Sequence, residues 1–290
     1  MTPVAIPSRA SVVRRRLAGH PAAASGLALL CVLFLLAFAG PYLSRWNHAE
    51  IDFTAFGEPP SAGHWFGTTP GGKDVYALTL HGMRKSLIIA LLVGVTATTA
   101  AAVAGTCAGY FGGRPDRLLM WLADLLLVLP VFLIVAIMSP LFLGTTWLIL
   151  AVPLAALLWM IPARAVRGMT ISLREREYIL AARYLGVSPV VIICRHIVPN
   201  LSTLLIIDAA MSVRAAVIAE SGLSYFGFGV QPPDSSLGTV IAAGAPAAAG
   251  YPWTFCFAAG LLVLIVLGVN LVGDGLRDVL DPTSQRGCRP

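Results

Sequence analysis

The chain has 290 residues, of which 57% are hydrophobic and only 12% are charged, with a mean hydropathy of +0.81. In soluble domains roughly a quarter of the residues are charged, so this composition excludes a soluble globular protein and indicates an integral membrane protein. A net charge of +6 would suggest nucleic-acid binding in a soluble chain. In a membrane protein the placement of the charges matters more than their sum.

Six apolar stretches are long enough to cross a bilayer, since a span needs about 20 largely apolar residues. The sequence therefore predicts an all-α integral membrane fold. The first stretch is longer than the roughly 7–15 apolar residues of a secretory signal, so an uncleaved anchor is favoured. The predicted transmembrane helices cover residues 25–44, 85–110, 118–139, 146–163, 201–221 and 253–273.

Positive charges are distributed unevenly between the segments that join these spans. If the N-terminus is cytoplasmic, fifteen arginines lie inside and four lysines or arginines lie outside. The positive-inside rule then places both termini in the cytoplasm. The predicted order is a cytoplasmic tail at 1–24, an external loop at 45–83, a membrane core at 84–276 that contains a second external loop at 222–252, and a cytoplasmic tail at 277–290.

Motifs for catalysis, metals and nucleotides are weak. The five cysteines form no Cys-x-x-Cys pair, so neither disulfides nor a cysteine metal site is favoured. Residues 67–73 have the spacing of a phosphate-binding loop, but Asp74 follows where a serine or threonine would ligand magnesium. An ordered turn is the better interpretation. Gly-x-Ser-x-Gly and His-Glu-x-x-His are also absent from the sequence, so a membrane enzyme has little support.

Ionisable residues inside spans are costly and are functional candidates by default. Asp208, Arg214 and Glu220 all fall on the fifth span or at its end. Arg214 is six residues from each acid, so neither is its helical neighbour at i+3 or i+4. Two alternatives stay open for the three residues: lining of a translocation pore, or hydrogen bonding between helices.

The third and fourth spans contain prolines, whereas the second contains many small residues. Prolines 130, 140, 153 and 162 interrupt helices unless neighbours satisfy the freed carbonyls. Small residues between Ala97 and Gly109 allow close backbone approach, which membrane helices use in place of hydrophobic packing. Both features predict a packed bundle.

A polar, arginine-rich segment at 172–200 separates the fourth and fifth spans and is typical of a helix-turn-helix. Ser172 and Glu175 have capping-box spacing, which predicts a helix start near Leu173. Gly186 is suited to the left-handed conformation that ends a helix. A second helix is predicted to start at Ser188 and Pro189 and to end at Pro199.

The first of these two helices carries a narrow apolar stripe, formed by Tyr178, Ala181, Ala182 and Leu185 at i, i+3, i+4 and i+7. Arginines and glutamates flank it. On a cytoplasmic segment such a stripe has no lipid to contact, so it predicts a protein partner.

The same segment resembles the EAA loop of ABC-importer permeases, through Glu177, Ala181, Ala182, Gly186 and Pro199. The strings EYILAARYLGVS and RHIVPN look like the dipeptide, oligopeptide and nickel branch of that family. Residues 64–87, 220–233 and 274–282 agree with the same branch. The anchor and the external segment before the core look like its C-type subunit. One departure is Thr-Thr-Pro-Gly-Gly-Lys-Asp at 68–74, where the family usually has Thr-Asp-x-x-Gly-Arg-Asp.

The resemblance implies a type I ABC-importer permease of the bacterial inner membrane, with six spans and a cytoplasmic coupling helix. It implies that the chain is no enzyme and binds no cofactor, because separate ATPase subunits bind ATP and magnesium. The implied partners are a homologous second permease, one or two ATPase subunits, an external substrate-binding protein and membrane lipid, with no nucleic acid. The implied coupling residues are Glu177, Tyr178, Ala181, Ala182, Arg183, Gly186 and Pro199.

The resemblance also implies the cargo, which is short peptides. The same machinery importing nickel or another small solute remains an alternative, because selection in such systems resides largely in the binding protein. A less favoured alternative is an ion-coupled secondary transporter that uses intramembrane carboxylates.

Overall fold

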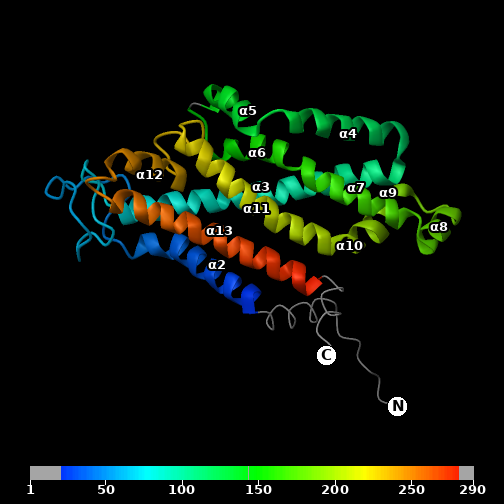
Figure 1. Ribbon diagram of the computed structural model, residues 1–290, viewed down its shortest axis with the longest axis horizontal. Helices are drawn as coiled ribbons and strands as arrows, with labels where there is room; N and C mark the ends of the chain where they lie inside the picture. Colours follow the sequence, from blue (N-terminus) through cyan, green and yellow to red (C-terminus); the bar gives the residue numbers. More distant parts are fainter. Residues whose placement is uncertain (1–20, 143, 281–290) are drawn as a thin grey trace, which may run out of the picture.

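A computed structural model describes residues 21–142 and 144–280. Its helices run mostly along one direction and form an elongated bundle (Figure 1). Within these described ranges, four helices are long and apolar enough to cross a membrane, and there are six candidate spans when each of two bent helix pairs counts as one. The prediction of an all-α membrane fold with six spans is confirmed on that count. Most of the predicted tails at 1–24 and 277–290 lies outside the described residues.

The first two long helices are α2 (Pro21–Ala39), followed by a short 3-10 turn η1 (Gly40–Tyr42), and α3 (Val75–Phe111). The side chain of Asp74 caps α3 by accepting a hydrogen bond of 2.7 Å from the Ala77 amide. With 37 residues at 1.5 Å each, α3 is longer than a hydrocarbon core of about 30 Å. The extra length lies at its N-terminal end, because α3 begins ten residues before the apolar stretch predicted to start at 85.

The third and fourth candidate spans are bent, as their prolines predicted. The third consists of α4 (Gly113–Val128) and α5 (Val131–Met138), continued by η2 (Ser139–Phe142), with an angle of 81° between its halves. Leu129 is extended at the break because the following Pro130 disfavours the helical conformation of the preceding residue. The fourth consists of η3 (Trp147–Leu150), α6 (Ala151–Leu158) and α7 (Met160–Arg174), with a bend of 44°.

Two ion pairs join these bent spans to each other. Arg167 donates to Asp116 with a distance of 2.7 Å between Nη2 and Oδ2, and Arg164 pairs with Asp124. Both acids lie on α4 and both arginines on α7. The two pairs therefore link about two turns of α4 to about one turn of α7.

The remaining membrane helices are α11 (Ser202–Tyr225) and α13 (Trp253–Leu280), and α2 packs beside α13. Between them lie α12 (Leu237–Gly244) and η5 (Ala245–Ala247), inside the segment predicted as an external loop at 222–252. This short apolar helix is absent from the sequence-based prediction because its eight residues are too few for a span. It packs against α3, α11 and α13.

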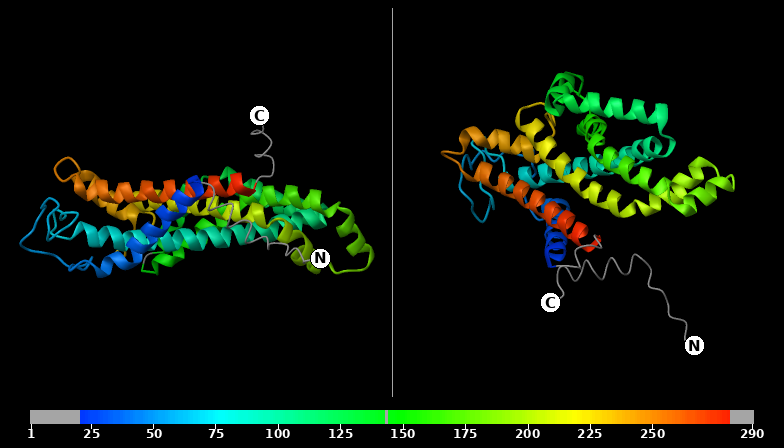
Figure 2. Two further views of the ribbon diagram at one scale, coloured as in Figure 1. Left: turned by 90° about the horizontal axis from the view of Figure 1, so that it is seen from below. Right: turned by 45° about the vertical axis from the view of Figure 1, so that its right-hand side comes forward.

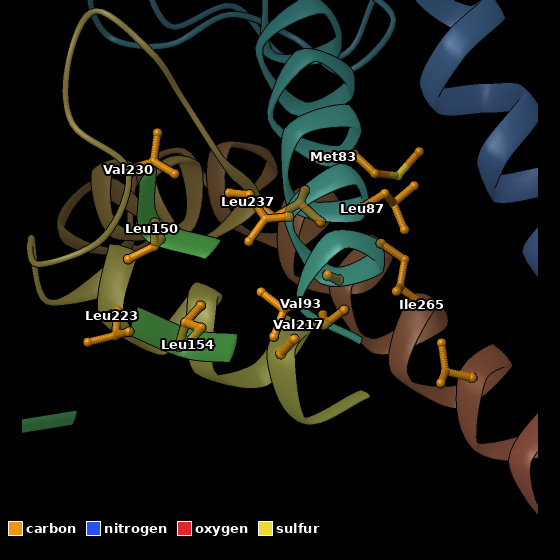
Figure 3. Packing of buried hydrophobic residues seen from close by; sticks show 14 of the residues in the cluster. Met83, Leu87, Val93, Leu150, Leu154, Val217, Leu223, Val230, Leu237 and Ile265 are labelled. Atoms are coloured by element: carbon orange, nitrogen blue, oxygen red, sulfur yellow. The ribbon is translucent and has the colours of Figure 1, made fainter. Parts of the chain in front are cut away.

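The main apolar core lies where α3, α6, α11, α12 and α13 meet (Figure 3). Glycines on α3 allow this close packing. A Cβ atom at Gly105 would lie 2.6 Å from the Ala163 carbonyl oxygen of α7, and one at Gly94 would lie 2.3 Å from Val213 of α11. The small residues of the second span therefore have the packing role that the sequence predicts.

The segment between α2 and α3 folds into ordered turns at one end of the bundle (Figure 2). Buried His64 lies between two carboxylates, with its Nδ1 2.9 Å from Asp74 and its Nε2 3.4 Å from Asp52. Hydrogen bonds from Thr54 lower the pKa of Asp52 below its usual value. The turn at 67–73 closes through the Thr69 amide and the Lys73 carbonyl at 2.9 Å. The prediction of an ordered turn here, rather than a phosphate loop, agrees with this geometry.

Candidate functional site

The segment 172–200 lies at the end of the bundle opposite the turns at 43–74 (Figures 1 and 2). It contains α8 (Glu177–Tyr184), α9 (Pro189–Ile192), a π-helical turn labelled η4 (Ile193–Ile197) and α10 (Val198–Asn200). We call residues 177–200 the hairpin. Its helices project beyond the membrane-length helices, so its tip is accessible to another protein.

The prediction that the first hairpin helix begins near Leu173 is wrong. Ser172 lies inside α7, which continues to Arg174, and α8 begins at Glu177 after Arg176 at its N-cap. The capping-box spacing is present, but the apolar face of α7 packs along α3 and extends the fourth span through it. Arg174 also donates a hydrogen bond of 2.9 Å to the Gly109 carbonyl of α3. Tertiary packing therefore overrides the local capping signal.

The turn between the two hairpin helices has the geometry that Gly186 predicts. Gly186 has a φ of +77°. Its amide donates to the Arg183 carbonyl, and the Val187 amide donates to the Ala182 carbonyl, both at 3.1 Å. This pair of bonds is a Schellman motif, which requires a left-handed residue after the helix. Gly186 thus sets the angle at which α9 leaves α8.

The prediction that Pro199 ends the second helix is wrong. The chain stays helical through η4 and α10, and α11 begins at Ser202. Pro199 occupies the first turn of α10, where a missing amide hydrogen is tolerated. The π-helical turn before it widens the backbone, a feature that is frequent at functional sites. The hairpin is therefore joined to α11 by an almost continuous helical path.

A small apolar core, separate from the main one, holds the hairpin to the bundle. Ile179 is fully buried in it, and Ala182 packs against it. Asn200 adds a polar link, since its side-chain amide donates to the Tyr178 hydroxyl at 3.3 Å and to the His196 carbonyl at 2.6 Å. The remaining buried members are Val166, Ile192, Ile193, Ile197 and Leu201.

The free surface of α8 differs from the predicted stripe. Ala182 faces inward, so it contributes to the hairpin's own packing, whereas Ala181 is exposed. Tyr184 and Leu185 are 90% and 83% exposed. Tyr184 was missed by the sequence analysis because it lies outside the stripe at i, i+3, i+4 and i+7. Glu177 and Arg183 are also exposed and give the tip a charged rim.

Glu220 on α11 is completely buried. Its carboxylate accepts hydrogen bonds of 2.7 Å from Ser86 of α3 and from Ser224, and one of 3.4 Å from Ser221. Ser86 Oγ in turn accepts from the Leu237 amide at 3.1 Å, at the start of α12. Of the two alternatives for Glu220, the interhelical one agrees with this geometry, because the carboxylate links α3, α11 and α12.

Arg214 and Asp208 lie elsewhere on α11. Arg214 donates a hydrogen bond of 3.0 Å to the Asn270 side chain of α13. Asn270 lines an apolar cavity of about 510 Å³ between α11, α12 and α13. The Oδ2 atom of Asp208 is buried and hydrogen-bonds to no group within the described ranges. The three predicted intramembrane residues therefore do not form one cluster, and Arg214 is part of an interhelical pair beside a cavity.

The chain matches two family models. Residues 75–286 match the binding-protein-dependent transport system inner membrane component. Residues 8–60 match the N-terminal transmembrane domain of oligopeptide transport permease C.

Curated relatives match along most of their length. The chain is 51% identical to the oligopeptide transport system permease protein OppC of Mycobacterium tuberculosis (strain ATCC 25618 / H37Rv), over 97% of this chain and 98% of the relative. It is 36% identical to the dipeptide transport system permease protein DppC of Bacillus subtilis (strain 168), over 94% of this chain and 85% of the relative.

Among solved structures, the fold is similar to a chain of the MetNI methionine ABC transporter in an inward-facing conformation. The TM-score is 0.55 at 20% identity, over 70% of this chain and 97% of that chain. This likeness supports the type I permease fold. The chain therefore belongs to the family of binding-protein-dependent transport system inner membrane components, the permease subunits of ABC importers, in which ATP is hydrolysed by separate subunits.

Proposed function

We propose that this chain is the C-type permease subunit of an importer for dipeptides or oligopeptides. The observation that carries the proposal is the 51% identity to an oligopeptide permease over 97% of the chain. The alternative cargo, nickel or another small solute, would use the same fold. We place both termini and the hairpin in the cytoplasm, on the strength of fifteen positive charges inside against four outside.

The hairpin would be the surface that docks on the ATPase. Tyr184 and Leu185 are large and exposed. Tyrosine is enriched among the few residues that carry most of the binding energy in protein interfaces, so Tyr184 would be the main anchor. Tyr178, Ala181, Glu177 and Arg183 would complete the contact around them. Gly186 sets the direction of α9, and Ala182 supports the docking surface from within.

Closure of the ATPases would displace the hairpin, and the hairpin would transmit this motion to the helices that form the pore. The helical path through η4, α10 and Pro199 joins the hairpin directly to α11. A rigid element transmits displacement better than a loop, because a packed core is not continuously deformable. ATP and magnesium would be bound by the partner ATPase, so this chain would need no cofactor of its own.

A second, homologous permease would form the other half of the pore. One face of α3 is apolar and is not covered by the described residues, since Val95 and Val103 are 61% and 60% exposed. Such a face would be covered by the second permease or by lipid. Substrate would be delivered at the opposite end of the bundle by an external binding protein.

Reconstitution tests the proposal. The chain would be combined with candidate second permease, ATPase and binding-protein subunits in lipid vesicles. ATP hydrolysis and uptake would then be measured with dipeptides, longer peptides and Ni²⁺. Stimulation by peptides and the binding protein together supports the peptide importer. Stimulation by Ni²⁺ and by no peptide would make nickel the cargo in place of peptides. Ion-driven uptake by this chain without any other subunit would contradict the proposal.

A further inference from the structure

A cavity of about 590 Å³ lies at the end of the bundle opposite the hairpin. This volume is in the usual range of about 300–1,000 Å³ for small-molecule sites. Its walls come from the turns before α3, the start of α3, the segment before α12, and α12 itself. None of the predicted site residues lies in it.

The cavity has one apolar wall and several polar groups. Val75, Leu78, Val240 and Ala243 form the apolar wall. The polar lining converges from segments far apart in the sequence, which is the arrangement of a binding site rather than of a simple packing defect. The polar residues that line the cavity are His48, Thr69, Lys73, Asp234, Ser235, Thr239 and Thr254.

The charges of the lining are unequally paired. Asp234 forms an ion pair with Lys85 of α3, and the Lys85 ammonium also lies 5.8 Å from the centroid of the Trp147 ring. Lys73 forms no ion pair with any residue in the described ranges. The cavity therefore has one acid that is already neutralised and one lysine that is not.

Two neutral groups complete the polar side. The hydroxyl oxygen of Ser235 is buried and has no hydrogen-bond partner among the residues that the structure describes. His48 stacks on His81 with ring centroids 3.7 Å apart. Burial lowers the pKa of His48, and the positive charges of Lys85 and Lys73 lower it further, so its imidazole is neutral near pH 7. A hydroxyl donor and an unpaired ammonium are the groups that a carboxylate accepts from.

We propose that this cavity binds the terminal carboxylate of a short peptide, held by Lys73 and Ser235, with the last side chain against the apolar wall. The proposal rests on the proposed function for its peptide cargo. A terminal residue presents a carboxylate and a side chain on one carbon, which fits a cavity that combines one charged corner with one apolar wall. The cavity would then receive peptide as it leaves the binding protein.

Chemical protection of Lys73 tests the site directly in the assembled transporter. An amine-reactive acylating reagent would label accessible lysines, and mass spectrometry would quantify the modification of Lys73. The probes are N-acetyl-Ala-Phe and its C-terminal amide, because neither consumes the reagent. The acid should slow the labelling of Lys73 about tenfold at about ten times its dissociation constant, and the amide should leave the rate unchanged.

Variants separate the cavity from general effects. Arg45 is exposed at the same end of the bundle and does not line the cavity, so a lysine introduced by Arg45→Lys should be labelled equally with and without the acid. Ser235→Ala should raise the concentration of the acid that is needed to protect Lys73 about tenfold, since the carboxylate loses a charge-assisted hydrogen bond. Ser235→Thr should retain protection.

Two outcomes would overturn the proposal. Equal protection by acid and amide, or none by either, removes the carboxylate site. Protection by the unliganded binding protein but not by the acid makes the cavity a contact for that protein instead. Because the acid and the amide are compared on the unmutated chain, the test is decisive even if a variant fails to fold. If peptides drive ATP hydrolysis while Lys73 stays unprotected, the proposed function stands and only the cavity site fails.

Discussion

The hairpin and the α12 region both connect membrane helices, but they are held in opposite ways. The hairpin has its own small apolar core and exposes its tip, where Tyr184 is 90% uncovered. In contrast, α12 is embedded among three long helices through buried polar groups, with Glu220 and Ser86 at the centre. A Cβ atom at Gly82 of α3 would lie 2.7 Å from the Ser236 carbonyl carbon, so the backbones are also in close contact there.

This difference separates a docking surface from a fixed part of the bundle. Changes to the exposed side chain of Tyr184 at the hairpin tip should alter association with a partner and leave stability unchanged. Changes at Glu220 should alter stability first. The predictions below test that separation, beginning with the largest expected effect.

Glu220→Leu should lower the free energy of unfolding by roughly 2–4 kcal/mol. The substitution removes the carboxylate to which the Ser86 and Ser224 hydroxyls donate and leaves both buried O–H groups without that acceptor. Thermal unfolding of the detergent-solubilised chain measures the effect. Glu220→Gln keeps one acceptor oxygen and should lose less than half as much. A Glu220→Leu variant as stable as the parent would show that the buried network does not hold α12.

Tyr184→Glu should weaken association with the ATPase about 30-fold, or by about 2 kcal/mol, as expected for an exposed aromatic anchor. The unfolding temperature should not change, because Tyr184 is 90% exposed and its side chain adds little packing within the described chain. Binding of the purified ATPase to the reconstituted permease is the measurement. Tyr184→Phe serves as the matched control and should bind nearly as well. Unchanged binding of Tyr184→Glu would place the docking surface elsewhere.

Gly186→Ala should destabilise the hairpin by about 1 kcal/mol, because an L residue is strained at positive φ. A Cβ atom there would meet no other atom within 4 Å, so strain alone acts. Hydrogen exchange should become about fivefold faster for hairpin amides and remain unchanged in α12. Gly186→Asn tolerates this conformation better and should show a smaller increase. Faster exchange in both regions would mean that they unfold together.

Ser172→Ala should change stability by less than about 0.5 kcal/mol. A true N-cap serine would cost about 1 kcal/mol on replacement, but Ser172 lies within α7 and is exposed. Alanine is also the better helix former. Chemical unfolding of the two chains distinguishes these values, and a loss near 1 kcal/mol would support a helix start at Leu173 instead.

Several features of the candidate site were predictable because their cause is local. Gly186 at the end of α8 and Ser188 with Pro189 before α9 follow from the backbone preferences of single residues. The bend at Pro130 is of the same kind. Tyr184 was not predictable from the stripe, since only the position of the hairpin core decides which side of α8 faces outward.

The amino-acid sequence by itself determined the membrane-spanning class, the number of spans, the turn at Gly186 and the family, because these depend on stretch length, single-residue conformation and motif order. Tertiary structure decided which of Ala181 and Ala182 faces outward, where α8 begins, and that Glu220 pairs with Ser86, 134 positions away. It also decided that Lys73 and Ser235 line one cavity. Contacts between distant segments depend on how whole helices pack, and no local preference specifies that packing.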